Sequence, residues 1–225
     1  FGDTFKTVNV TNMKAMFNAC GATSLDLRGF DTSKVTDMSE MFKGTSNATN
    51  IYFGDYFVTK DVINMHYMFG DSGVSSLDLR SWDTSKVTNM SQMFYNTSNV
   101  TNIFMGNKFV TTNVIDMFQM FDGSNVGELD LQYFENSNVE TIHGIFQNTT
   151  NLTDLVLGSN FVTNKVTNLS DIFNDSGVTT LDLSDWDTSN VVNMESTLKD
   201  TDGLTSLTLG GTFDSSNVGD FSNFL

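Results

Sequence analysis

Apolar residues recur along this chain in a fixed order, and the order repeats on average every 26 residues. Each repeat opens with the pattern L-x-x-L-x-L, as at Val74, Leu77 and Leu79. Because alternate residues of a strand point to the same side, this pattern predicts one short strand per repeat with its leucines turned inward. A large aromatic residue follows each predicted strand, and columns of Val, Met and Phe come next. We therefore expect coils that stack through parallel strands about 4.8 Å apart and share one core.

The repeats alternate between two types. An Asp-containing type recurs every 52 residues, and an apolar type lies midway between its copies. Repeats of about 20 to 50 residues are typical of solenoids, propellers and arrays. We predict a leucine-rich-repeat-like solenoid with one short parallel strand per 26-residue turn, the rest being turns, short helical segments and loops. Residues 1–225 are expected to form a single elongated repeat domain of about nine coils, truncated at both ends as a piece of a longer protein. The Asp-containing copies begin at Leu25, Leu77, Leu129 and Leu181, and the apolar copies at Ile51, Ile103 and Leu155.

A polar column also repeats, mostly as Asn or Asp. Such side chains at bends hydrogen-bond the backbone of the turn and of the next coil, so we interpret the column as structural. Its members are Asn12, Asp37, Asn64, Asn89, Asp116, Thr141, Asn168, Asn193 and Asp220.

Composition excludes several classes of function. The formal net charge of −16 argues against a nucleic-acid partner, because phosphate binding needs clustered Lys and Arg. No apolar run approaches the length of a membrane span, so we expect no membrane insertion in this fragment, and no secretory signal begins at Phe1. Cys20 is the single cysteine, so no intrachain disulfide can form. The absence of proline leaves the turns to Gly, Asn, Asp and Ser.

Two segments carry a resemblance to a known family. "FDTSKVTDMSEMF" begins at Phe30 and "WDTSKVTNMSQMF" at Trp82, and "LDL" precedes each. They resemble the 26-residue repeat of the BspA-like leucine-rich repeat proteins of bacterial surfaces, of the lactobacterial and mycoplasma type. The resemblance implies an extracellular protein at the bacterial cell surface, anchored to the cell wall through regions absent here, with a role in adhesion. This chain departs from the family where Thr or Ser replaces the Cys that often follows Met-Phe, where aromatic residues replace the leucine-rich-repeat asparagine, and where the repeat types alternate.

The outward positions of the strands form the candidate binding surface. If Leu77 and Leu79 point inward, Asp78 points outward, and its column alternates between carboxylates and mostly apolar side chains. Neighbours on this face can form Asp26–Arg28 and Asp78–Arg80 pairs. Carboxylates also accept hydroxyl or amide hydrogens, Arg donates in a fork, and rings offer flat apolar surface, so this face is suited to a sugar or a peptide. Exposed rings on a scaffold are typical of recognition surfaces, although the same residues can simply cover a sheet. The predicted ligand-binding residues are Asp26, Arg28, Tyr52, Asp78, Arg80, Phe104 and Asp130.

Candidates for other chemistry are fewer. An enzyme needs one unique site, and the third Asp-containing repeat comes nearest, with Glu135, Glu140 and His143 close in sequence. The column of His143 has mixed composition, which is typical of a solvated face. No EF-hand spacing is present, and core packing accounts for the periodic methionines, so we expect neither a metal site nor a cofactor.

We therefore expect a non-catalytic adhesion module that recognises a host or microbial surface ligand. Its partner would be a protein or glycan of host mucus, extracellular matrix or epithelium. A structural spacer that projects another domain from the cell wall is the alternative, and a polysaccharide-acting enzyme is a third hypothesis. Because repeat arrays need polar caps, we also expect the ends at Phe1 and Leu225 to fray or to self-associate end to end.

Overall fold

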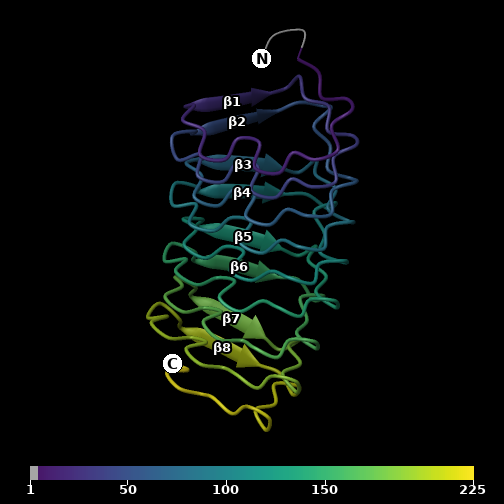
Figure 1. Cartoon of the computed structure of the whole chain (residues 1–225). Coiled ribbons are helices and arrows are strands. Elements are labelled where there is room, and N and C mark those ends of the chain that lie inside the picture. Colours follow the sequence, from purple (N-terminus) through teal and green to yellow (C-terminus); the bar gives the residue numbers. More distant parts are fainter. Residues whose placement is uncertain (1–4) are drawn as a thin grey trace.

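The computed structural model describes residues 5–225, and these form a solenoid of stacked coils (Figure 1). Eight four-residue strands lie in the described part of the chain, one in each successive coil along a single side of the stack. The predicted repeat solenoid with one short parallel strand per turn is thus confirmed. The strands are β1 (Ser24–Leu27), β2 (Asn50–Phe53), β3 (Ser76–Leu79), β4 (Asn102–Met105), β5 (Glu128–Leu131), β6 (Asp154–Leu157), β7 (Thr180–Leu183) and β8 (Ser206–Leu209).

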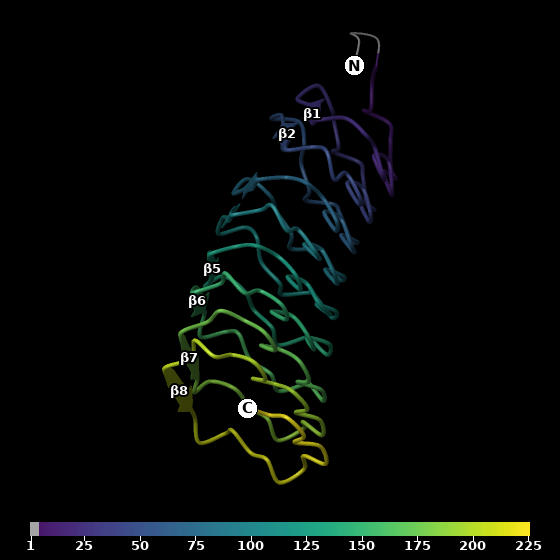
Figure 2. The same cartoon turned by 90° about the vertical axis from the view of Figure 1, so that its left-hand side faces the viewer.

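Each strand turns alternate side chains inward and outward. In β1, Leu25 and Leu27 are buried, whereas Ser24 and Asp26 are exposed. Strands β3, β5 and β7 repeat this order of exposed and buried positions. The side view in Figure 2 places the strands along one edge of the solenoid and the turns along the opposite edge. The outward strand positions therefore form one continuous face.

The strands pair in twos, so the expectation of uniform stacking from coil to coil is wrong. Hydrogen-bonded parallel pairs join β1 to β2, β3 to β4, β5 to β6 and β7 to β8. The residue that follows each strand explains the alternation. Gly54 follows β2, and a side chain there would overlap the carbonyl oxygen of Arg28, which follows β1. Arg80 holds the equivalent position after β3, and β3 does not pair with β2, as expected where a residue with a Cβ replaces the glycine.

Aromatic rings form the centre of the core. The ring that follows each strand is fully buried in the middle coils, as at Phe30, Trp82 and Phe134. A second column, from the Met-Phe pairs, stacks ring on ring from Phe42 to Phe173 with centroids 5.3 to 5.9 Å apart. The predicted aromatic, Val, Met and Phe columns are confirmed as one core that runs the length of the described coils.

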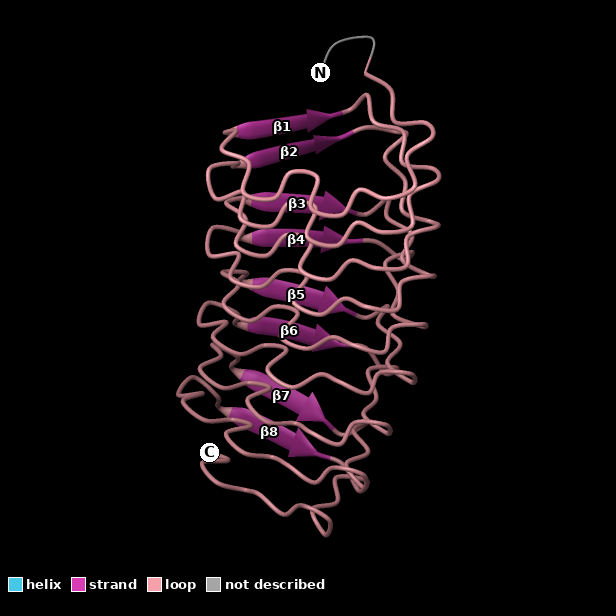
Figure 3. Ribbon diagram, viewed as in Figure 1, coloured by secondary structure: helices cyan, strands magenta, loops and turns pink. Residues whose placement is uncertain are grey.

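The short helical segments predicted between the strands are wrong, because no helix is present in residues 5–225 (Figure 3). The segments around the Met-Phe pairs are successive turns instead. Their backbone N–H groups donate across coils, for example from Phe42 to the carbonyl of Met68 at 2.8 Å. Two residues per coil take positive φ values between 48° and 68°, which turns these backbone groups toward the neighbouring coil. One such column is Ala19, Gly44, Asp71, Asn96, Gly123, Asn148, Asp175 and Asp200.

The polar column beside these turns has the structural role that the sequence predicts. The side-chain oxygen of Asn64 accepts the backbone N–H of His66 at 3.0 Å, closing a local turn. The backbone of Asn64 bridges to Asp37 in the coil before and to Asn89 in the coil after. Thr141 has no carboxylate or amide, and no bridge joins it to Asn168 in the following coil of the described chain.

The structure describes only one of the two ends at which fraying was expected. Phe1, where fraying was expected, lies outside the described residues. At the other end, Leu225 is exposed and Phe221 is partly exposed. A search of the described residues for membrane-crossing helices finds none of sufficient length and apolar character.

Candidate functional site

The outward positions of the paired strands bring the predicted binding residues onto one face. The parallel register places Asp26 of β1 beside Tyr52 of β2, and Asp78 of β3 beside Phe104 of β4. Tyr52 and Phe104 are 49% and 48% exposed, which is unusually open for aromatic residues in a chain that buries most of its phenylalanines. The carboxylates also face solvent, so the face is accessible along both strand pairs.

The side chain of Arg28 joins the carboxylate and the ring of the first strand pair. Its Nε lies 2.9 Å from Asp26 Oδ1 and its Nη2 lies 2.6 Å from Oδ2. The backbone N–H of Arg28 donates to the same carboxylate at 3.1 Å. The guanidinium carbon lies 5.9 Å from the centre of the Tyr52 ring. A fork of two charge-assisted hydrogen bonds thus fixes the cation beside an exposed ring.

The second strand pair repeats this geometry. Arg80 Nε lies 2.9 Å from Asp78 Oδ1, and Nη2 lies 2.5 Å from Oδ2. The guanidinium carbon lies 5.7 Å from the centre of the Phe104 ring. We call each such group of three side chains an Asp–Arg–ring unit: Asp26, Arg28 and Tyr52 form the first, and Asp78, Arg80 and Phe104 form the second.

Hydrogen bonding keeps both carboxylates charged. The side-chain bonds from Arg28 lower the pKa of Asp26 to about 2, and those from Arg80 lower the pKa of Asp78. The same bonds raise the pKa of each guanidinium. The ion pairs are solvent-exposed, and exposed pairs contribute little to folding stability. Their effect is therefore to set geometry and to neutralise charge locally.

The third and fourth strand pairs keep the carboxylate but lose its partners. Gln132 Nε2 donates to Asp130 Oδ2 at 2.7 Å, and Val156 stands where the ring would be. In the last pair the backbone N–H of Ser184 donates to Asp182, and Thr208 replaces the ring. Asp130, predicted as part of the binding face, thus lies on that face but outside any Asp–Arg–ring unit.

A hollow of about 670 Å³ lies where β2 and β3 separate. It is a consequence of strand pairing in twos, which is why the repeat alone does not predict it. Its lining includes Arg28 and Tyr52 of the first unit and Asp78 and Arg80 of the second, but neither Asp26 nor Phe104. The hollow therefore joins the two units into one candidate site whose volume falls in the range of small-ligand pockets.

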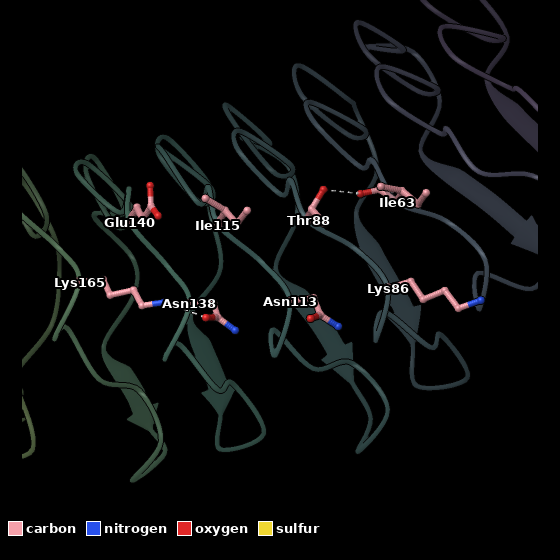
Figure 4. Close-up of a pocket in the computed structure, with 8 residues that line it drawn as sticks. All are labelled: Ile63, Lys86, Thr88, Asn113, Ile115, Asn138, Glu140 and Lys165. Atoms are coloured by element: carbon pink, nitrogen blue, oxygen red, sulfur yellow. Dashed lines mark hydrogen bonds between the residues drawn. The ribbon is translucent and has the colours of Figure 1, made fainter.

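The structure also shows a groove that the sequence analysis missed, on another face of the solenoid (Figure 4). It measures about 570 Å³ and runs across consecutive coils. Its amide groups are used within the protein, since Asn113 Nδ2 donates to the Ser85 carbonyl at 2.7 Å. In the sequence, the groove corresponds to a column of Lys and Asn residues and to an adjacent column that carries Ile at every second coil. The lining residues are Ile63, Lys86, Thr88, Asn113, Ile115, Asn138, Glu140 and Lys165.

The three residues considered for catalysis make separate contacts and do not form one site. Glu140 lines the groove of Figure 4, and Glu135 accepts a bond from Thr112 at 3.3 Å. His143 packs against Phe118 with ring centres 4.4 Å apart, and burial lowers its pKa. Within residues 5–225 no hydrogen bond or ion pair joins two of these three candidates, and no three His, Cys, Asp or Glu side chains gather in a metal-holding group.

The rings that lie outside the core columns do not form a single cluster. Tyr52 and Phe104 lie on the strand face, whereas Tyr67 and Tyr95 pack together among the turns with ring centres 5.5 Å apart. Of these rings in the described part of the chain, Tyr52 and Phe104 alone share the strand face with the other predicted binding residues. Position within the coil decides which rings can meet one ligand.

Comparison with known proteins identifies one family. Residues 11–128 and 124–225 match the family model described as "Mycoplasma protein of unknown function, DUF285". The two matched segments together cover nearly the whole chain. No curated protein matches, and no solved structure matches.

Proposed function

We propose, from the premise that this chain belongs to the DUF285 family of Mycoplasma-type repeat proteins, that it is a non-catalytic ligand-binding module of a bacterial cell surface. Its strand face would recognise a protein or glycan of a host or microbial surface. The resemblance to BspA-like adhesins and the acidic, repetitive composition support an extracellular location, anchored through other parts of the protein.

One observation carries this proposal. The two Asp–Arg–ring units hold exposed aromatic and guanidinium groups in fixed geometry, and Arg28, Tyr52 and Arg80 border one hollow between the units. Folding does not require these groups to be exposed, because the core beneath them is complete without them. Aromatic and Arg side chains fixed on a rigid scaffold are typical of the central residues of binding surfaces. A surface serving only as a spacer needs neither.

The test is a binding survey of the purified chain on arrays of glycans and of extracellular-matrix and mucus proteins. The double variant Tyr52→Ala/Phe104→Ala should lose binding to any array component that the wild type binds. Val156→Ala is the matched control, because Val156 holds the same outward column with similar exposure but belongs to no Asp–Arg–ring unit. Equal binding by the wild type and the double variant would remove the strand face from the proposal.

A spacer is the second candidate, and the continuous core favours it. Stacked rings and inter-coil hydrogen bonds run through all the middle coils, which suits a stiff projecting rod. If the isolated chain binds nothing on the arrays while shortening the array by two coils weakens adhesion of the whole cell, the spacer would replace the ligand-binding function.

A further inference from the structure

The two Asp–Arg–ring units repeat along the solenoid axis at a fixed interval. Tyr52 and Phe104 lie two coils apart, on β2 and β4. β3 and β4 pair about 4.8 Å apart, as neighbouring parallel strands do, whereas β2 and β3 are unpaired and separate around the hollow, so this interval is somewhat more than roughly 10 Å. A ligand that meets both units in the same way must itself repeat over that distance along the axis.

The chemistry of the units limits what that ligand can be. Each guanidinium is already neutralised by its own carboxylate through a two-bond fork. Its Nη1 has no partner within the described residues, so each unit offers hydrogen-bond donors beside an open ring but no net positive charge. The chain as a whole carries a formal charge of −16. Polyanions such as sulfated or sialylated chains are therefore repelled over the range of the Debye length.

Neutral sugars fit these groups. Pyranose rings present a C–H face that packs on aromatic side chains, and their hydroxyl groups accept hydrogen bonds from Arg. In β-1,4-linked chains each sugar is turned over relative to the one before it, so equivalent groups recur at every second sugar. The face also recurs at every second coil, with an aromatic ring in one coil and a donor fork in the other.

From this match we infer that the strand face binds an uncharged, linear, β-linked polysaccharide lying parallel to the solenoid axis. One disaccharide repeat spans one Asp–Arg–ring unit, with sugar faces on Tyr52 and Phe104. The sugar between them lies over the hollow at β2 and β3, where Arg28 and Arg80 donate to its hydroxyl groups. This inference rests on the proposed ligand-binding function and names the class of ligand.

Length dependence provides the test. Isothermal titration of the purified chain uses β-1,4-linked glucose and N-acetylglucosamine oligomers of two and six sugars, with heparin and polygalacturonate as polyanions. A disaccharide reaches one ring, and a hexasaccharide reaches both. The hexasaccharide should therefore bind about tenfold more tightly, as expected for one added aromatic contact. A tenfold rise in salt should change this affinity less than about twofold, because no net charge is paired on binding.

Variants connect the length effect to the two rings. Phe104→Ala should reduce hexasaccharide affinity to that of the disaccharide while leaving disaccharide binding at Tyr52. The double variant Arg28→Gln/Arg80→Gln should weaken the binding of both oligomers. It keeps both rings, so it provides a second test if Phe104→Ala folds poorly. Val156→Ala is again the control, and thermal unfolding checks that each variant is folded.

The outcomes separate this inference from the proposed function. Neutral oligomers bound with length dependence and lost in Phe104→Ala would support it. A polyanion or a protein bound in preference, through the same two rings, would overturn the inference and keep the strand face as a binding site. Binding unaffected by either ring, or no binding on any array, would overturn the inference and the proposed function together.

Discussion

The first two strand pairs and the last two share a scaffold but differ in what they expose. Beneath both halves, buried rings stack at similar spacing, as Phe69 with Phe94 at 5.7 Å and Phe146 with Phe173 at 5.4 Å. On the surface, the first two pairs carry complete Asp–Arg–ring units, whereas the last two keep only Asp130 and Asp182 of the set.

This difference separates residues that the fold needs from residues that it does not. The core recurs in all coils because each coil must bury its apolar side chains against two neighbours. The Arg and ring positions vary because an exposed side chain on a strand contributes fractions of a kcal/mol to the sheet. The Asp recurs throughout because it also closes a turn onto the backbone two residues on, as in Asp182 with Ser184. The first half thus carries exposed Arg and aromatic side chains that the fold does not need.

The largest expected effect tests whether the two halves really share one scaffold. Phe94→Ala and Phe146→Ala remove fully buried rings from the first and second halves. Each should lower the free energy of unfolding by about 3 to 5 kcal/mol, through lost burial and the cavity left behind. Chemical denaturation measures both. If Phe146→Ala costs far less, the second half is a looser scaffold and its bare face has a structural cause.

A glycine variant tests the pairing of strands in twos. In Gly54→Ala the new methyl group meets the carbonyl oxygen of Arg28, so β1 and β2 must move apart. We expect a loss of about 1 to 3 kcal/mol, as for other overpacked sites, and weaker ligand binding at the adjoining hollow. Gly29→Ala is the control, because no atom lies near its added methyl group. Equal stability of the two variants would show that Gly54 does not set the pairing.

A graft sharpens the comparison by building a third unit. Gln132→Arg with Val156→Tyr gives β5 and β6 the side chains of the first pair. Hexasaccharide affinity, or affinity for any long ligand found on the arrays, should rise roughly two- to tenfold, from one further ring packing on the ligand at about 0.5 to 1.5 kcal/mol. Titration calorimetry against the wild type measures this gain. A graft that folds normally and gains nothing would mean that the face binds through something other than these units.

The smallest expected effect concerns pH. The fork from Arg28 lowers the pKa of Asp26 to about 2, below the usual value of 3.8. A carboxyl group with a depressed folded pKa adds stability above the unfolded pKa and loses it as the pH falls through the folded value. The ion pair of the first unit should therefore persist at pH 4 and break near pH 2. Carbon-detected NMR of the carboxyl group follows this titration, and Arg28→Gln should raise the pKa toward its ordinary value.

Much of the fold could be predicted because a constant repeat length shows which residues take equivalent positions in successive coils. The positions of Leu25, Leu77 and their equivalents identified the strands, and the alternation of inward and outward residues placed Asp26 and Tyr52 on the surface. The turns were mistaken for short helices, although one of the two left-handed columns consists mostly of Gly, Asn and Asp, which tolerate positive φ better than other residues. That composition was the available signal.

The candidate site was less predictable. The sequence placed Asp26, Arg28 and Tyr52 on one face, and it allowed the carboxylate either to pair with Arg28 or to accept hydrogen bonds from a ligand. In the structure Arg28 occupies both carboxylate oxygens. The groove at Ile63 and Lys86 was missed because neither residue type is unusual on an exposed coil.

The sequence by itself determined the coil length, the strand positions, the shared core and which side chains face outward, because these follow from periodicity along one chain. Only the tertiary structure decided that strands join in twos, that β2 and β3 separate around a hollow, and that each Arg engages both oxygens of its own Asp in a fork. Those features depend on contacts between atoms of different coils, such as Gly54 against the Arg28 carbonyl, and on side-chain geometry that no spacing encodes.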